Sequence, residues 1–245
     1  MIAAGLGSFL RAVQDLCFPP RCLACGQRLA SSRPPLFCAS CAGGLRSIAS
    51  PICTSCGRPF PDAAGGDHLC GPCLRGSWHF TRARALFLYT TPIAKAIHGL
   101  KYGHTTAALA TFRFFFQARQ AELALAIPDR IVPVPLHPHR LRQRGFNQAL
   151  LLARTLFPGH PDIRPDLLER HRATPPQTRL SGEVRRRNLK GAFRVVNPGE
   201  VAGKSVLLLD DVFTTGATVD ECARALRHAG AGEVQVLTMA RVEES

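Results

Sequence analysis

Along the last two-thirds of the chain, short runs of apolar residues alternate with longer stretches in which apolar residues recur at helical spacing. The short runs predict buried strands at residues 83–89, 131–134, 167–169, 193–196, 205–209 and 234–238. The longer stretches predict helices at residues 93–102, 105–126, 146–157 and 217–228. Strands that alternate with helices predict an α/β fold, in which a parallel sheet is covered by helices on both faces.

The first third of the chain lacks this alternation. Apolar residues fall at helical spacing only in the first sixteen positions, at Ile2, Leu6, Phe9, Leu10, Val13 and Leu16. Between residues 17 and 78 there are few large apolar side chains. The chain therefore divides into an N-terminal amphipathic helix over residues 1–19, a small module over residues 20–80 and an α/β domain over residues 81–245.

The N-terminal helix is expected to pack on the protein. Arg11 and Asp15 interrupt its apolar run, which is far too short to span a bilayer, and it has no basic region typical of a signal peptide. Attachment to a membrane surface is the alternative. We expect no membrane insertion and a cytoplasmic location, where cysteine thiols stay reduced.

The small module contains eight of the ten cysteines, arranged as four Cys-x-x-Cys pairs. Paired units at these separations are typical of zinc ribbons, in which two turns present four thiolates to one ion. Such sites are closed to water, so the zinc would be structural, and its binding energy of about 10–16 kcal/mol is enough to fold a segment without a core. The predicted ligands are Cys22, Cys25, Cys38 and Cys41 for one ion and Cys53, Cys56, Cys70 and Cys73 for a second.

Other uses of these cysteines are a disulfide scaffold and an iron–sulfur cluster. The expected cytoplasmic location argues against the first, and the wide spacing between the pairs argues against the second. A crossed pairing of the four units remains open. Gly26 and Gly57, which follow the second cysteine of their pairs, would let the chain turn back under the metal. Cys17 and Cys222 are expected to be ordinary packed thiols.

The strand at residues 205–209 leads directly into two acids and a hydroxyl-rich turn. Asp210 and Asp211 would repel a phosphate, but carboxylates are suitable acceptors for the vicinal hydroxyls of a ribose. The turn consists of Thr214, Thr215, Gly216, Ala217 and Thr218. Because a predicted helix starts there, its free N–H groups and dipole favour a phosphate. A sugar phosphate lying across the strand end would bind to the acids through its hydroxyls and to the turn through its phosphate.

Basic residues dominate the charge of the chain, whose net value of +14 implies anionic partners. The strand at residues 131–134 runs into a loop with three arginines, in which Arg140, Arg144 and Gly145 would form a second anion cradle and Asn147 would cap the next helix. A solvated basic loop is the alternative. Residues 175–193 form a third basic stretch, interpreted either as a mobile loop or as a solvated helix face.

Residues 206–218 resemble the signature with which type I phosphoribosyltransferases bind 5-phosphoribosyl 1-pyrophosphate (PRPP), namely an apolar strand, two acids and a Thr-Thr-Gly-x-Thr turn. Further motifs are Lys-Tyr-Gly at 101–103, Arg-Gly-Phe-Asn-Gln at 144–148, and Gln177 with Arg-Asn at 187–188. With the doubled cysteine sets, they make nearly the whole chain similar to the ComF family of competence proteins.

The resemblance implies a type I phosphoribosyltransferase-like domain preceded by a double zinc ribbon, and for some members a role in handling incoming single-stranded DNA. It implies that Asp210 and Asp211 hold the ribose hydroxyls and that residues 214–218 bind the 5′-phosphate. The loop from Arg140 to Gly145 would face the pyrophosphate, and residues 177–188 would form a lid. In an active enzyme Mg²⁺ would bind with PRPP, and the two acids would stabilise positive charge at C1′.

Two functions fit these residues. One is a phosphoribosyltransferase that uses Mg²⁺ and PRPP, for which no motif identifies the acceptor. The other is a non-catalytic factor of DNA uptake that holds single-stranded DNA or a competence helicase and retains a relic or sensory pocket for PRPP or another ribose 5-phosphate. Binding of PRPP in the setting of competence is the reading that both share.

Overall fold

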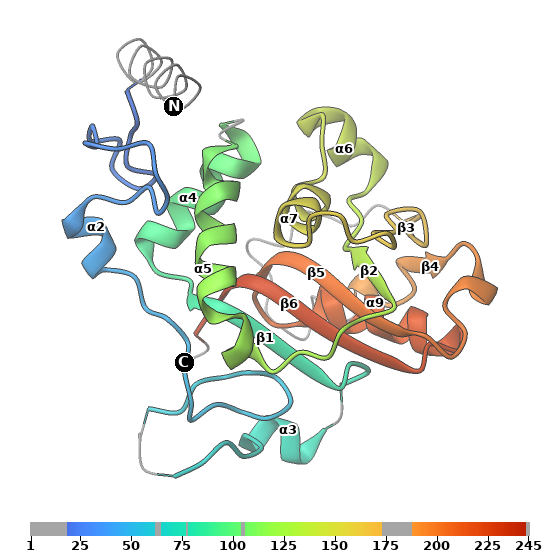
Figure 1. Ribbon diagram of the computed structural model, residues 1–245. Coiled ribbons are helices and arrows are strands. Elements are labelled where there is room, and N and C mark those ends of the chain that lie inside the picture. Colours follow the sequence, from blue (N-terminus) through green and yellow to red (C-terminus); the bar gives the residue numbers. More distant parts are fainter. Residues whose placement is uncertain (1–18, 62–64, 77, 104–105, 173–187, 244–245) are drawn as a thin grey trace, which may run out of the picture.

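A computed structural model of the protein describes residues 19–61, 65–76, 78–103, 106–172 and 188–243. The predicted N-terminal helix, Cys17 and nearly all of the predicted lid at residues 177–188 lie outside the described residues. The described part contains a parallel sheet with helices on both sides and two cysteine-rich modules at its periphery (Figure 1).

The central sheet contains four parallel strands in the order β1-β6-β5-β2. Their bounds are Arg82–Leu88 for β1, Arg130–Pro133 for β2, Ser205–Phe213 for β5 and Glu233–Arg241 for β6. The predicted α/β class is confirmed. The long strand β5 lies inside the sheet, between β6 and β2, and its side chains are therefore covered on both faces.

Two of the predicted strands do not join this sheet. β3 (Leu168–Arg170) and β4 (Phe193–Val195) pair with each other, antiparallel, in a separate two-stranded sheet. A strand inside a parallel sheet is apolar on both faces, whereas these three-residue strands carry Glu169, Arg170 and Arg194. The expectation of one sheet formed by all six predicted strands is therefore wrong.

Helices cover both faces of the central sheet, as predicted. α4 (Thr91–Tyr102), α5 (Ala107–Leu123) and α7 (Gln148–Leu156) lie on one face, and α9 (Ala217–His228) lies on the other (Figure 1). The alternation of side chains along β5 divides the core accordingly. Leu207 and Leu209 pack with α4, α5 and α7, while Val206 and Leu208 pack with α9, β3 and β4.

Short elements complete the fold. α2 (Ala39–Gly43) and α3 (Gly71–Arg75) each begin directly after a cysteine of a predicted zinc pair. α6 (Pro138–Arg144) follows β2, and the 3-10 helix η2 (Pro198–Glu200) precedes β5. None of the described helices combines the length and the apolar character that crossing a bilayer requires.

The two cysteine-rich modules contact different parts of the α/β domain (Figure 1). In the first module, Cys22 and Phe37 share a core with α4 and α5, and the N–H of Leu36 donates to Thr111 Oγ1 of α5 at 3.2 Å. The second module lies along β1, where the N–H of Ala83 donates to the carbonyl oxygen of Ser55 at 2.7 Å. Both modules are therefore packed against the α/β domain.

Gly26 and Gly57 occupy equivalent turns in the two modules, and both have left-handed φ values, of 76° and 70°. A Cβ atom at Gly57 would lie 2.5 Å from the carbonyl oxygen of Ala83, whereas none of the described atoms lies within 4 Å of one at Gly26. The first turn therefore needs glycine only for its backbone angle, and the second needs it also for close approach to β1.

We predict that Gly57→Ala destabilises the protein more than Gly26→Ala. Gly26→Ala should cost about 1–2 kcal/mol because an alanine adopts this angle unfavourably. Gly57→Ala should cost roughly 1–3 kcal/mol more, since β1 or the turn has to move. Urea unfolding at a fixed excess of zinc measures both, and equal losses would contradict the close approach of the turn to β1.

Candidate ligand site and metal centres

The two acids Asp210 and Asp211 lie within β5, three and two positions before its last residue, Phe213. The sequence analysis ended this strand at Leu209, and that boundary is wrong. β6 runs on to Arg241 and pairs with β5 as far as Phe213, which keeps the acids in the ladder. Because strand side chains alternate, Asp211 lies on the face of α4 and α7, and Asp210 lies on the face of α9.

Asp211 is buried and faces a cation that the sequence analysis did not assign to the site. Lys101, in the last turn of α4, forms an ion pair with Asp211 Oδ2. The side-chain amide of Gln148, the first residue of α7, donates to Asp211 Oδ1 at 3.4 Å. Burial alone would raise the pKa of Asp211, but the ammonium group of Lys101 outweighs burial and lowers it. Asp211 is therefore held as a carboxylate.

The surroundings of Asp210 shift its pKa in the opposite direction to that of Asp211. Burial of its carboxyl group, followed by the negative charge of Asp211, raises the pKa of Asp210. Its Oδ1 atom accepts a hydrogen bond from the N–H of Asp211 at 2.9 Å. Solvent still reaches Asp210, so it is the more accessible of the two acids.

The basic segment after β2 begins next to the acids because β2 pairs with β5 in parallel. The N–H of Val134 donates to the carbonyl oxygen of Leu209 at 2.9 Å. Asn147 caps α7 as predicted, since its side chain accepts from the N–H of Ala149 at 2.9 Å, and it also donates to the carbonyl oxygen of Val134 at 3.1 Å. Both ends of the basic segment are thereby fixed to the sheet edge where the acids lie.

The basic segment is not the loop that the sequence analysis described, because residues 138–144 form α6. This helix buries none of its residues, so it lacks the apolar stripe by which helices are recognised. Its ends do carry ordinary helix signals. Pro138 stands at its start, and Gly145 ends it with a left-handed φ of 79°.

Of the predicted anion-binding arginines, the structure connects Arg144 to the acids. Its guanidinium group donates to Gln148 Oε1 and lies 5.1 Å from the centre of the Tyr102 ring. A continuous chain of polar contacts therefore runs from Arg144 through Gln148 to Asp211 and Lys101.

Arg140 lies in a different environment, beside Arg170. Arg170 is a buried residue of β3 whose guanidinium group lies 5.5 Å from the centre of the Phe193 ring. Burial, followed by the positive charge of Arg140, lowers the pKa of Arg170, and the charge of Asp210 opposes this effect. Arg170 thus adds a second cation on the side of Asp210, which the sequence analysis also did not foresee.

The hydroxyl-rich turn leads from β5 into α9 and has the features of an anion site. Gly216, with a φ of 74°, is the N-cap residue of α9 and offers no side chain to the free N–H groups of the first turn. The Thr215 hydroxyl oxygen is buried and has no hydrogen-bond partner among the described residues. A buried hydroxyl without a partner beside free N–H groups fits a phosphate, which accepts from both.

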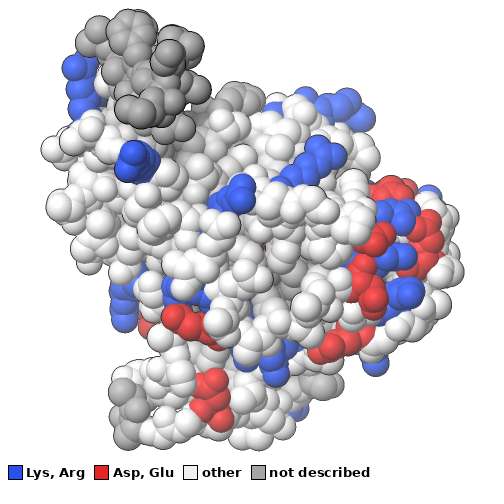
Figure 2. Space-filling model, viewed as in Figure 1, with Lys and Arg blue, Asp and Glu red and all other residues white. Residues whose placement is uncertain are grey.

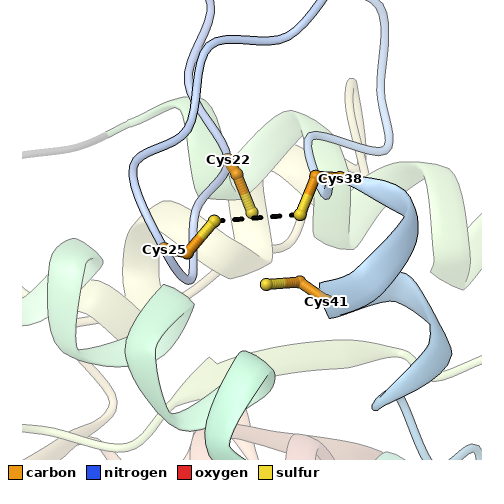
Figure 3. Close-up of side chains that lie close together, drawn as sticks. All are labelled: Cys22, Cys25, Cys38 and Cys41. Carbon is orange, nitrogen blue, oxygen red and sulfur yellow. Dashed lines mark hydrogen bonds between the residues drawn. The ribbon is translucent and has the colours of Figure 1, made fainter.

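The predicted zinc ligands come together in the two expected sets of four. Within each set the sulfur atoms lie within 4.8 Å of one another, and the side chains of the first set point toward a common centre (Figure 3). The Sγ atoms of Cys25 and Cys38 lie 3.7 Å apart, and those of Cys56 and Cys70 lie 3.8 Å apart. The nine described cysteines are all free of disulfides, so the disulfide scaffold is not seen.

The backbone favours the thiolate form of the first cysteine in each set, whereas a hydrogen bond with Cys38 raises the pKa of Cys41 to about 12 and burial raises the pKa of Cys56. Burial would raise the pKa of Cys53, but hydrogen bonds from neighbouring N–H groups, including that of Cys70 at 3.4 Å, bring it down to about 6. Similar bonds lower the pKa of Cys22 to about 6 against the effect of burial. Thiolate is the form that binds zinc, and both sets therefore suit a structural ion. Cys222 is a buried thiol of α9, as expected.

Comparison with known families defines the class of protein. The family described as double zinc ribbon domain matches residues 13–74, and the phosphoribosyl transferase domain matches residues 165–245. The protein is therefore a double zinc ribbon joined to a phosphoribosyltransferase domain. Together with the two cysteine clusters, this match supports two structural zinc sites.

Relatives of similar length share this organisation. The chain is 38% identical over 232 residues to the DNA utilization protein YhgH of Salmonella typhimurium, which covers 92% of this chain and 99% of that protein. It is 33% identical over 232 residues to Competence protein F of Haemophilus influenzae, covering 90% and 96%. Competence protein ComFC of Bacillus subtilis is 29% identical over 216 residues, covering 83% of each. The chain belongs to the ComF family of competence proteins.

We predict that Lys101→Met destabilises the protein at neutral pH by about 3 kcal/mol, because it leaves Asp211 as a buried, uncompensated charge. Lys101→Arg should retain most of the stability. Lys95→Met is the matched control, since Lys95 lies on the same helix but is exposed, and its cost should stay within roughly 0.5 kcal/mol.

The stability contributed by the ion pair between Lys101 and Asp211 should decrease at low pH. Because the pKa of Asp211 is lowered in the folded protein, the ion pair stabilises the protein above the usual carboxylate range and is lost as the pH falls through the pKa of Asp211. The difference between wild type and Lys101→Met in urea unfolding should therefore shrink on acidification. A difference that is constant with pH would contradict the ion pair.

Proposed function

We propose that this protein binds PRPP or another ribose 5-phosphate at the end of β5. The observation that carries the proposal is the buried Thr215 hydroxyl beside the free N–H groups of α9, a few residues after two acids on the same strand. The turn offers donors, which a phosphate needs, and the acids offer acceptors, which ribose hydroxyls need. The membership of the chain in a family with a phosphoribosyltransferase domain supports this reading.

Each residue of the site has a distinct proposed role. Asp210 accepts hydrogen bonds from the ribose hydroxyls. Asp211, which Lys101 keeps charged, is a second hydrogen-bond acceptor for them. The 5′-phosphate binds to residues 214–218. Arg144 and Gly145 lie at the end of α6, next to the acids, and are proposed to face the pyrophosphate together with Arg140.

Magnesium accompanies PRPP in this proposal and would neutralise the charge of the pyrophosphate when bound. The acids of β5 and the turn before α9 would bind the ribose and its 5′-phosphate. In a transfer reaction, the carboxylates of Asp210 and Asp211 would stabilise the positive charge that develops at C1′. The same residues would bind the ligand in a protein that does not turn it over.

The biological setting that we propose is the uptake or use of DNA. Relatives are named as DNA utilization and competence proteins, and they match this chain over nearly its whole length. The net charge of +14 suits an anionic polymer. In this setting the protein would hold single-stranded DNA or a competence helicase, with the ribose phosphate as substrate or signal.

The visible charge distribution favours one surface for this second role. In Figure 2 basic side chains are spaced along the upper part of the face, where Figure 1 shows α6, and acidic side chains gather toward one side. β3 and β4 lie toward that side in Figure 1, and the described ion pair between Arg194 and Glu169 joins them. The arginines of α6 therefore offer a more suitable surface for DNA than the neutralised side does.

The ligand proposal predicts calorimetric binding of ribose 5-phosphate, and of PRPP with Mg²⁺, to the zinc-loaded protein. Asp210→Asn/Asp211→Asn should reduce the affinity at least tenfold, because loss of hydrogen bonds to charged groups costs about 1.5–3 kcal/mol. Asp166→Asn, in an exposed ion pair, is the control and should bind as wild type does. A well-folded wild type that gives no heat with either ligand would refute the proposal.

Turnover of PRPP is measured in a separate experiment, as the release of pyrophosphate. Incubation with PRPP, Mg²⁺ and a metabolite extract should release pyrophosphate from the wild type if transfer occurs. Equal release by the doubly substituted protein would show that the acids take no part in it.

The DNA role predicts binding of single-stranded DNA that weakens steeply with salt, because bound counterions are released. Replacing Arg185, Arg186 and Arg187 by glutamine should weaken binding and flatten its salt dependence. These three lie outside the described residues, and Arg194→Gln is a control because Glu169 already neutralises Arg194. Filter binding between about 50 and 200 mM salt measures both effects. Affinity that changes with neither salt nor substitution would argue against this role.

A further inference from the structure

The second zinc module contacts the candidate phosphate turn through a single aromatic residue. Trp78, the one tryptophan of the chain, follows the last zinc ligand and precedes β1. Its indole N–H donates to the sulfur of Cys73 at 3.2 Å. A donor aimed at a ligand sulfur orients that ligand, so the position of Trp78 is tied to the position of the Cys73 sulfur.

The other side of the Trp78 ring supports the turn between β5 and α9. The ring stacks on Phe80, with ring centres 5.1 Å apart, and meets the edge of Phe213 at 6.1 Å. A Cβ atom at Gly216 would lie 2.5 Å from the Phe213 ring and 3.0 Å from the Trp78 ring. The N-cap residue of α9 therefore rests directly on both rings, and a shift of Trp78 changes the space beneath the turn.

Two polar contacts reinforce the same connection. The N–H of His79 donates to Asp220 Oδ1, in the first turn of α9, at 2.7 Å. Arg241 donates to the carbonyl oxygen of Cys56 at 2.6 Å, and its guanidinium group lies 4.5 Å from the centre of the Phe213 ring. Cys56 is thus connected through Arg241 to the Phe213 ring beneath the turn, and the residue after Trp78 is connected to the first turn of α9.

The first zinc module has no comparable link within the described residues. Its cysteines pack with α4 and α5, in the core on the opposite face of the sheet from α9. Trp78, in contrast, packs against both the second set of cysteines and the core under α9. The two modules have equivalent ligand sets, but the first packs against α4 and α5, whereas the second packs through Trp78 against the core under α9.

We propose that Trp78 couples the second zinc centre to the ribose phosphate site, so that zinc at Cys53, Cys56, Cys70 and Cys73 and a ligand at residues 214–218 bind cooperatively. This inference rests on the proposed function of the turn. Zinc fixes the position of the Cys73 sulfur that the indole contacts, the indole packs against Phe213 and Gly216, and the turn keeps its N–H groups in place for a phosphate. Linkage requires the reverse effect, in which the ligand strengthens zinc binding by the same factor.

The test measures the zinc affinity of the second centre by competition with a chromogenic chelator, with and without saturating ribose 5-phosphate. Cys25→Ser protein is used to remove the first centre, so that the remaining zinc belongs to the second. We expect ribose 5-phosphate to raise the zinc affinity about fivefold or more, which is the usual lower range of coupling between sites. Fluorescence of the single tryptophan should change in the same titration.

Trp78→Phe keeps an aromatic ring under the turn but removes the donor to Cys73. In the same Cys25→Ser background it should bind zinc, and ribose 5-phosphate should then change its zinc affinity less than twofold. Phe114→Leu, an exposed aromatic on α5, is the matched control and should retain the full coupling. Circular dichroism of each zinc-loaded variant verifies that it is folded.

The possible failures are distinguishable. If the wild type binds neither ribose 5-phosphate nor PRPP with Mg²⁺, the proposed function fails and this inference fails with it. If the wild type binds ribose 5-phosphate but its zinc affinity is the same with and without the ligand, the inference alone is overturned. Coupling that persists in full in Trp78→Phe would overturn the role of the indole donor.

Discussion

The alternation of side chains along β5 is the constraint on which the site depends. In a strand buried on both faces, successive residues must find partners on opposite sides of the sheet. Asp211 consequently faces α4 and α7, where Lys101 and Gln148 hold it as a carboxylate, and Asp210 faces α9 and the turn. Two adjacent acids thereby acquire opposite electrostatic environments, with the pKa of one lowered and that of the other raised.

The same strand joins the acids directly to the candidate phosphate turn, which begins after Phe213. β5 continues in the ladder with β6 up to Phe213, and the turn begins directly afterwards. The distance between the carboxylates and the N-terminus of α9 is therefore set by the sheet. A rigid spacing of this kind suits a ligand whose hydroxyls and phosphate are covalently joined.

Metal binding and packing are interdependent in the cysteine-rich quarter. The modules contribute few apolar side chains, and those they have pack against the α/β domain, as Phe37 does against α5. Zinc would supply the cohesion that a core supplies elsewhere. Because each module lies against a different part of the domain, the modules are not interchangeable, and only the second lies close to the site at the end of β5.

Most of the fold could be predicted because its signals are local. The apolar runs identified the strands, and the helical spacing identified α4, α5, α7 and α9. α6 was missed because it buries no residue and so has no apolar stripe, although Pro138 and Gly145 mark its ends. β3 and β4 were predicted as strands, but they pair with each other outside the central sheet. This pairing was not predicted because it depends on which strands lie side by side in the folded protein.

The sequence by itself determined the chemistry available to this protein: eight thiolates in four pairs, two adjacent acids and a hydroxyl-rich turn at a helix start. Those features depend on residue type and short spacing, which are visible along the chain. Only the tertiary structure decided which groups meet, such as Lys101 with Asp211 and Trp78 with Gly216. These partners come from elements far apart in the chain, and their meeting depends on how helices and modules pack on the sheet, which no local pattern encodes.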